Sequence, residues 1–271
     1  MKILYKFASR SRPKKFFECI ENIYINKRHD NFIILASLDI DDVTMNNEDV
    51  IQKIKQYDKV YPIFGISTSK IGAINRDINE CDYDFQILIN TSDDMVFIQD
   101  GFDDIIRNDM KEHFPDTDGV LHYNDGNQKD NVMTMSIMGR KYYDRFGYIY
   151  HPDYKSVWCD VEQTEVAWML GKHKYMGDEK VIFRHLHPAW GLAQYDEQYC
   201  KSENLNVWGE DLKTCIERKQ KNYDLKEIVN AYKYPPSAMQ QWIKDLNNAR
   251  LNNGLIPLEF DVRNHGYSKN P

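Results

Sequence analysis

Short apolar runs alternate with amphipathic segments through the first 90 residues of the chain. Apolar runs of strand length occur at residues 3–7, 32–38, 60–64 and 85–89. The segment after Pro13 repeats apolar side chains at helical spacing, as in Phe16, Ile20 and Ile23, and shorter helical stripes occur at 50–54 and 71–78. This alternation predicts an α/β protein with a mostly parallel sheet covered by helices.

The second half of the chain is less regular. Apolar patterns predict strands at residues 119–122, 132–137 and 181–187, and helices at 161–170 and 238–251. From about residue 210 the sequence is polar and helical in character, and Pro235-Pro236 interrupts it. We expect a main α/β domain over residues 1–200 and a helical C-terminal extension, residues 201–271, that packs on the same domain.

Polar clusters follow the predicted strands, and the carboxyl ends of parallel strands meet at the edge of the sheet where ligands bind. The clusters after the first and third strands contain hydroxyls and cations, which suit a nucleotide diphosphate. Such groups are also common in solvated loops. The candidate residues of these two clusters are Ala8, Ser9, Arg10, Arg12, Lys70, Asn75 and Arg76.

Two neighbouring carboxylates, Asp93 and Asp94, follow the fourth predicted strand together with Ser92. Oxygen ligands at this edge suit Mg²⁺ or Mn²⁺, and magnesium sites commonly share coordination with the phosphates of a substrate. A simple Asx turn at the end of the strand is the alternative interpretation.

His185 and His187 lie two residues apart in the predicted strand at 181–187. Residues at this spacing share one face of a strand, as a pair of metal ligands would. Two ordinary hydrogen-bonded histidines would show the same pattern.

Asp160 and Glu162 are candidate general bases, because a carboxylate can accept the proton of a hydroxyl group as a new bond forms. The alternative is a capped helix start, since Asp160 precedes Gln163 by three residues at the beginning of an apolar helical stripe. The two interpretations are compatible, because a capping residue lies at the exposed end of its helix.

Composition narrows the possible partners and location. The chain has 35 Lys and Arg against 42 Asp and Glu, a formal net charge of −7, which gives no basic excess for non-specific binding to nucleic acid. We expect no membrane span, because the longest apolar runs are far shorter than a bilayer requires. No leader pattern begins the sequence, which favours the cytoplasm. The five cysteines are scattered, and we expect free thiols.

Several common motifs are absent from the sequence: the mononucleotide P-loop, the dinucleotide G-x-G-x-x-G pattern and the G-x-S-x-G nucleophile elbow. Aromatic side chains make up 13% of the residues and provide rings that could stack on a sugar or a base, although most such rings lie in protein cores. The tryptophans are Trp158, Trp168, Trp190, Trp208 and Trp242.

Taken in order, these motifs resemble the GT-A fold glycosyltransferases, particularly the family 2-like group that includes small phage and bacterial members. Residues 7–13 are similar to the family's first-strand loop, which contacts the nucleotide, and Asp39 matches an aspartate that usually meets the base. Residues 73–94 are similar to the stretch from its asparagine-arginine helix to its metal-binding D-x-D. Here Thr91 stands in place of the first aspartate and Asp93 in place of the second.

The resemblance implies a mixed sheet of the GT-A type and a metal-dependent glycosyltransferase with a nucleotide-diphosphate sugar donor, most simply a UDP-sugar. Asp93, with His185 or His187, would hold Mn²⁺ or Mg²⁺ against the diphosphate, and Asp160 would be the base for an inverting transfer. The acceptor would be a glycan hydroxyl, a protein hydroxyl or a modified base in phage DNA. A phage-encoded protein of this kind would act in the host cytoplasm.

Two further hypotheses remain open at this point. A nucleotidyltransferase also places acidic strand ends and a divalent metal on an α/β sheet, and it would release pyrophosphate. A catalytically inactive GT-A-like domain that binds a glycan would explain Thr91 at the position of an expected acid. The sequence does not distinguish these hypotheses, and it does not indicate an oligomeric state.

Overall fold

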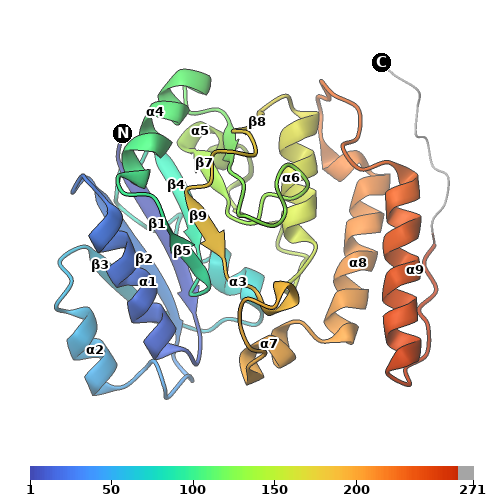
Figure 1. The fold of residues 1–271 in the computed structure, drawn as a ribbon, viewed down its shortest axis with the longest axis horizontal. Helices are drawn as coiled ribbons and strands as arrows, with labels where there is room; N and C mark the ends of the chain where they lie inside the picture. The colour runs from blue at the N-terminus through green and yellow to red at the C-terminus, as the bar shows by residue number, and fades with distance from the viewer. Residues whose placement is uncertain (262–271) are drawn as a thin grey trace.

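A computed structural model describes residues 1–261 of the protein, in which seven strands form one mixed sheet in the order β3-β2-β1-β4-β7-β6-β8 (Figure 1). The first four strands along the chain are parallel, whereas β7 runs antiparallel to both β4 and β6. The strands are β1 (Ile3–Ser9), β2 (Phe32–Asp39), β3 (Val60–Gly65), β4 (Ile87–Thr91), β6 (Val120–His122), β7 (Ile137–Gly139) and β8 (His173–Tyr175).

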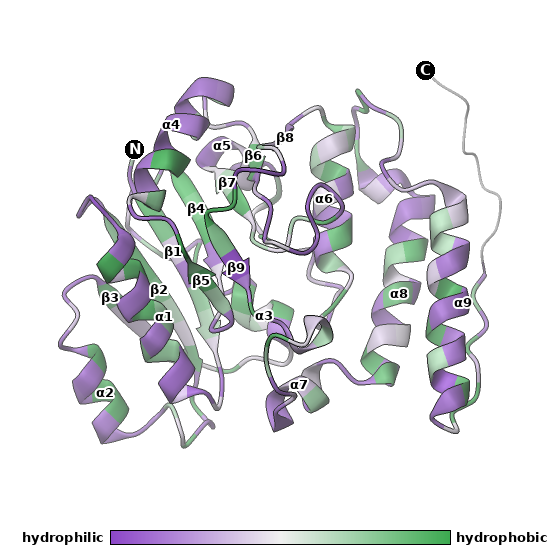
Figure 2. Cartoon of the chain, viewed as in Figure 1, coloured by the Kyte–Doolittle hydropathy of each residue, from purple (hydrophilic) through white to green (hydrophobic). Residues whose placement is uncertain are grey.

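Helices cover both faces of the sheet, because the central strands are apolar on both sides (Figure 2). In β1, Ile3, Tyr5 and Phe7 face one helical layer, and Leu4 faces the other. The first layer contains α1 (Pro13–Asn26), α2 (Glu48–Ile54) and α4 (Phe102–His113). The second contains α3 (Lys70–Asn75), α5 (Arg140–Phe146) and α6 (Cys159–Met169).

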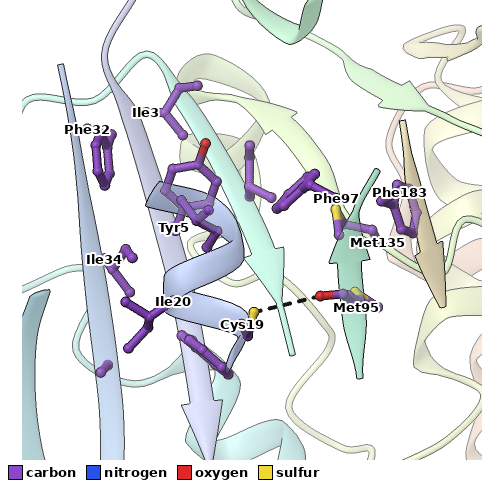
Figure 3. Close-up of a cluster of buried hydrophobic side chains, with 14 of the residues drawn as sticks. Ile3, Tyr5, Cys19, Ile20, Phe32, Ile34, Met95, Phe97, Met135 and Phe183 are labelled. Atoms are coloured by element: carbon purple, nitrogen blue, oxygen red, sulfur yellow. Dashed lines mark hydrogen bonds between the residues drawn. The ribbon is translucent and has the colours of Figure 1, made fainter. Parts of the chain in front are cut away.

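A separate two-stranded ribbon lies beside the main sheet. Strands β5 (Met95–Phe97) and β9 (Phe183–His185) pair antiparallel, and Met95 lies opposite His185. Figure 3 shows Phe97 and Phe183 of this ribbon in the same apolar cluster as Tyr5 of β1. The ribbon is therefore anchored in the core and carries its strand ends to the carboxyl edge of the sheet.

The C-terminal part of the described chain is helical, and its helix α8 packs against α6. It contains α7 (Glu197–Ser202), α8 (Leu205–Gln220) and α9 (Pro236–Asn252), with short 3₁₀ turns at Pro188–Trp190 and Asn222–Asp224. Helices α8 and α9 share a small core of Leu212, Ile216, Met239 and Leu246. None of the helices in residues 1–261 combines the length and apolar character needed to cross a bilayer.

The predicted α/β sheet with C-terminal helices is confirmed, and the differences are local. The strand predicted at 132–137 is wrong for most of its length, because strand pairing begins only at Ile137. Val132, Met133 and Met135 are buried in a connecting loop instead, so their alternation reflects burial without a strand ladder. The division at residue 200 stays a prediction, and residues 262–271 of the predicted extension lie outside the described chain.

His122 of β6, which is fully buried, pairs with His173 of β8, which is partly buried, and Nδ1 of His122 lies 2.9 Å from Nε2 of His173. Burial lowers the pKa of His122 from 6.5 to about 3 and that of His173 to about 4, and repulsion between the two rings adds to the effect on His122. Asp130 opposes this shift and Lys233 reinforces it. Both rings are therefore neutral in the folded protein at pH 5, whereas unfolded histidines are protonated there.

This pair is expected to make the protein acid-sensitive. The two neutral histidines contribute fully to the free energy of unfolding above pH 6.5, and this contribution falls as the pH drops toward their folded pKa values. The loss is about 2 kcal/mol for each histidine between pH 7 and pH 5. Denaturant unfolding at the two pH values measures the loss. The double variant His122→Gln/His173→Gln should lose less stability on acidification than the wild type. An unchanged acid loss in that variant would assign the acid sensitivity to other groups.

Candidate active site

A cavity of about 700 Å³ opens at the carboxyl ends of β1, β2 and β4. Parallel strands place their ends on one side of a sheet, so segments far apart in sequence meet in this cavity. Twelve of the predicted site residues line it: Ala8, Ser9, Arg10, Arg12, Asp39, Lys70, Ser92, Asp93, Asp94, Asp160, His185 and His187.

Asp93 is held by the last residue of β1 and by a residue of the loop after it. Its two carboxylate oxygens accept hydrogen bonds from the Ser9 hydroxyl at 2.8 Å and from Arg12 at 2.9 Å. Burial raises the pKa of Asp93 and outweighs the opposing charge of Arg12. The Arg12 guanidinium also binds Asp196 at 2.6 Å and lies 4.1 Å from the Tyr199 ring centroid.

Asp94 lies beside His185, because the β5–β9 pairing brings their strand ends together. Oδ2 of Asp94 is 3.5 Å from Nε2 of His185 and accepts a hydrogen bond from the Tyr199 hydroxyl. Burial disfavours charge on both groups, but their mutual attraction outweighs it. The pKa of Asp94 therefore lies well below its ordinary value, and the pKa of His185 lies above its own.

His187 belongs to a different interaction. Its Nε2 lies 3.2 Å from the carboxylate of Glu203, which also accepts a hydrogen bond from Lys70 at 3.4 Å. The ring centroids of His185 and His187 are 5.2 Å apart. Of the two, His185 is thus the one that contacts the acidic strand end.

Asp39 lies at the end of β2 on the opposite side of the first-strand loop. Arg10 donates to Asp39 at 2.8 Å and to both oxygens of Asp41. The second oxygen of Asp39, Oδ1, is buried without a hydrogen-bond partner, although the Arg76 guanidinium is 4.0 Å away. A buried acceptor without a donor is costly, so this oxygen is available for an N–H group of a ligand.

Asp160 lies in the first turn of α6 and lines the cavity. One of its oxygens accepts a hydrogen bond from the Val161 amide at 2.9 Å. Burial raises the pKa of Asp160 and outweighs that hydrogen bond. Its carboxylate is therefore a stronger base than that of an ordinary aspartate.

Three predicted residues lie outside the cavity. The Asn75 side chain bonds the backbone of Ile149 and Tyr150. Arg76 lies beneath the end of β2 and donates to the Leu38 carbonyl at 2.6 Å. Glu162 faces away from Asp160 and forms a buried ion pair with Arg218 at 2.8 Å. Residues two apart on a helix point to nearly opposite sides, so Asp160 and Glu162 do not share this cavity.

Within residues 1–261, no group of three or more His, Cys, Asp or Glu side chains forms a metal-binding cluster. Asp94 and His185 provide one carboxylate and one imidazole at the same place in the cavity. This donor set fits Mg²⁺ or Mn²⁺, which take one or two protein ligands and complete their coordination with phosphate oxygens and water. A cation here would depend on a bound diphosphate.

No protein-family model matches the chain, and no curated protein sequence does either. Solved structures do match. The mannosyltransferase PcManGT from Pyrobaculum calidifontis, solved with GDP-Man and Mn²⁺, superposes with a TM-score of 0.55 at 11% identity, over 94% of this chain and 76% of that one. S. aureus TarS 1-349 in complex with UDP-GlcNAc gives 0.52 at 13% identity, over 94% and 84%. The chain has the GT-A fold.

Several residues of this GT-A cavity did not emerge from the sequence motifs. Tyr199 and Glu203 contact Asp94 and His187, and both come from the segment around α7. The N-cap of α7, Asp196, was the available sign of a helix there, but nothing in the sequence places that helix over the sheet edge. The loop residues Ser67 and Thr68 also line the cavity.

Proposed function

We propose that this protein is a glycosyltransferase that moves a sugar from a nucleotide-diphosphate donor to an acceptor hydroxyl. The observation that carries the proposal is the single cavity that joins Asp39, the Asp94–His185 pair and Asp160. These groups suit a base, a diphosphate with a cation, and an acceptor hydroxyl respectively. The matched GT-A structures were solved with nucleotide sugars, which supports the same donor class here.

At the nucleotide end, the free oxygen of Asp39 accepts an N–H of the base. Uracil offers one such donor at N3, which favours a UDP-sugar. At the diphosphate, Asp94 and His185 would hold Mn²⁺ or Mg²⁺, which would supply positive charge that stabilises a nucleoside diphosphate as a leaving group. Asp93 orients Ser9 and Arg12 through its two hydrogen bonds.

At the acceptor end, Asp160 takes the proton from the acceptor hydroxyl as that oxygen attacks the anomeric carbon. The described residues that line the cavity include no second carboxylate in the first turn of α6, since Glu162 is committed to Arg218. One base and direct displacement give inversion at the anomeric carbon.

The test is nucleoside diphosphate release from a panel of nucleotide sugars, with Mn²⁺ and with EDTA. We expect release from one donor that requires the cation. Asp93→Asn should lower this release at least tenfold, because it weakens the hold on Arg12 and Ser9, while circular dichroism stays that of the wild type. In a parallel assay, pyrophosphate release from a nucleoside triphosphate and a sugar 1-phosphate would indicate a nucleotidyltransferase. Nucleotide-sugar binding without release would indicate an inactive binding domain.

A further inference from the structure

Three tryptophans meet at one end of the cavity and form what we call the tryptophan cluster: Trp158, Trp208 and Trp242. Trp158 precedes α6, whereas Trp208 lies in α8 and Trp242 in α9. The three helices stand side by side (Figure 1). The ring of Trp158 lies 5.4 Å from that of Trp208 and 5.1 Å from that of Trp242.

All three rings line the cavity and are only partly buried. The three side chains pack against the apolar core between α8 and α9. They also line the cavity, where they form an aromatic wall. Asp160, the proposed base, is two residues from Trp158 along the chain.

Packing alone does not explain the unpaired indole nitrogen and the backbone conformation of Trp158. Its indole Nε1 is buried without a hydrogen-bond partner, although buried indole N–H groups ordinarily find one. Its backbone is also in the left-handed region, with φ of 63°. A bulky residue is rare in that conformation and pays a strain cost there, and such strain clusters at functional sites.

The charges in the cavity indicate the kind of molecule that meets this wall. Four cations line the cavity in the described chain, and each is paired with a carboxylate: Arg10 with Asp39 and Asp41, Arg12 with Asp93 and Asp196, Lys70 with Glu203, and Lys201 with Glu197. Lys70 acts electrostatically on Cys159 and Asp160, next to Trp158 in sequence, but its charge is already paired with Glu203. A polyanion such as DNA needs cations for its phosphates, so an uncharged ligand fits this end better.

We propose that the tryptophan cluster is the acceptor subsite and binds a neutral sugar ring of a carbohydrate acceptor. This inference rests on the proposed glycosyltransferase activity. The apolar face of the ring stacks on the indoles, and its hydroxyls bond polar groups. Trp158 Nε1 donates to one of them. The side chains of Gln128 and Asn131, which line the same cavity, are further partners. The C-terminal helices thus complete the site and select the acceptor.

The experiment compares sugar transfer with donor hydrolysis in the full-length protein. Acceptors are neutral β- and α-linked disaccharides and p-nitrophenyl hexosides, with double-stranded DNA as the alternative. Trp208→Ala removes one ring of the wall, Trp208→Phe keeps an aromatic face, and Trp168→Ala removes an indole outside the cavity. We expect the ratio of transfer to hydrolysis to fall about tenfold in Trp208→Ala through a higher acceptor KM, and to change much less in the other two.

A second measurement separates this proposal from the proposed function. Quenching of tryptophan fluorescence by the same saccharides reports binding whether or not any donor is hydrolysed. Saturable quenching that Trp208→Ala weakens supports the subsite even if no nucleotide sugar reacts, in which case only the transferase activity fails. An unchanged transfer ratio in Trp208→Ala, transfer to DNA alone, or no binding of any saccharide would overturn the proposal.

Discussion

Replacing Asp160 with asparagine is expected to lower the rate of sugar transfer by about 10²- to 10⁴-fold, the usual contribution of a positioned general base. The amide is nearly isosteric but cannot take the acceptor proton. Because burial raises the pKa of Asp160, the wild-type rate should begin to fall, as the pH decreases, at a higher pH than an ordinary aspartate would give. Initial rates from pH 4 to 8 for both proteins measure the effect.

The matched control is Asp153→Asn, which changes an exposed carboxylate in the loop before α6 that does not line the cavity. It should transfer sugar at the wild-type rate. Wild-type transfer by the Asp160→Asn variant would show that another group accepts the proton. An acid limb that persists in that variant's residual rate would likewise assign the titration to a different residue.

Replacing Lys219 with methionine is expected to cost about 3 to 5 kcal/mol of folding free energy, the range for breaking a buried ion pair from one side. Lys219 and Glu165 are almost fully buried, and two N–O distances of 2.5 and 2.6 Å join them. Lys219 also donates to the Tyr234 carbonyl at 2.7 Å. The variant leaves the Glu165 carboxylate buried without its cation.

Denaturant unfolding of the variant and the wild type measures this loss. Lys213→Met on the same helix is the control, because its partner Glu217 and Lys213 itself are both more than half exposed. Exposed pairs contribute about 0 to 1 kcal/mol. Equal losses in the two variants would show that the Lys219 interaction is no stronger than a surface pair.

The parallel half of the sheet was predictable because β1 and β2 are apolar except for Lys6 in β1 and the polar residues Ser9, Ser37 and Asp39 toward the strand ends. Such runs are typical of strands that helices cover on both faces. Helix α4 was missed although Phe102, Ile106 and Met110 repeat every four residues, because charged residues fill the positions between them. Strand β6 was predicted at 119–122 and forms at Val120–His122. Strand β7 is also three residues long, but it was predicted too early in the chain because the buried loop before it is apolar as well.

The site was predictable where it consists of strand ends, since parallel pairing alone brings Ser9, Asp39 and Asp93 to one edge. Glu162 was placed in the site although residues two apart on a helix point to nearly opposite sides, and its partner Arg218 comes from α8, which only tertiary packing brings beside it. The aromatic wall depends on three helices that meet only through tertiary packing. The five tryptophans were visible in the sequence, but only packing shows that Trp168 lies outside the cavity.

The β5–β9 ribbon holds Asp94 next to His185 through only three residue pairs. Side chains alternate between the two faces of a strand, so the spacing between β8 and β9 sets the phase of β9. A single-residue insertion in residues 176–182 that is passed on to the strand would place Arg184 opposite Met95, and a deletion would place Leu186 there. Either change would turn His185 away from Asp94, so the length of this connection is constrained even where its composition is free to vary.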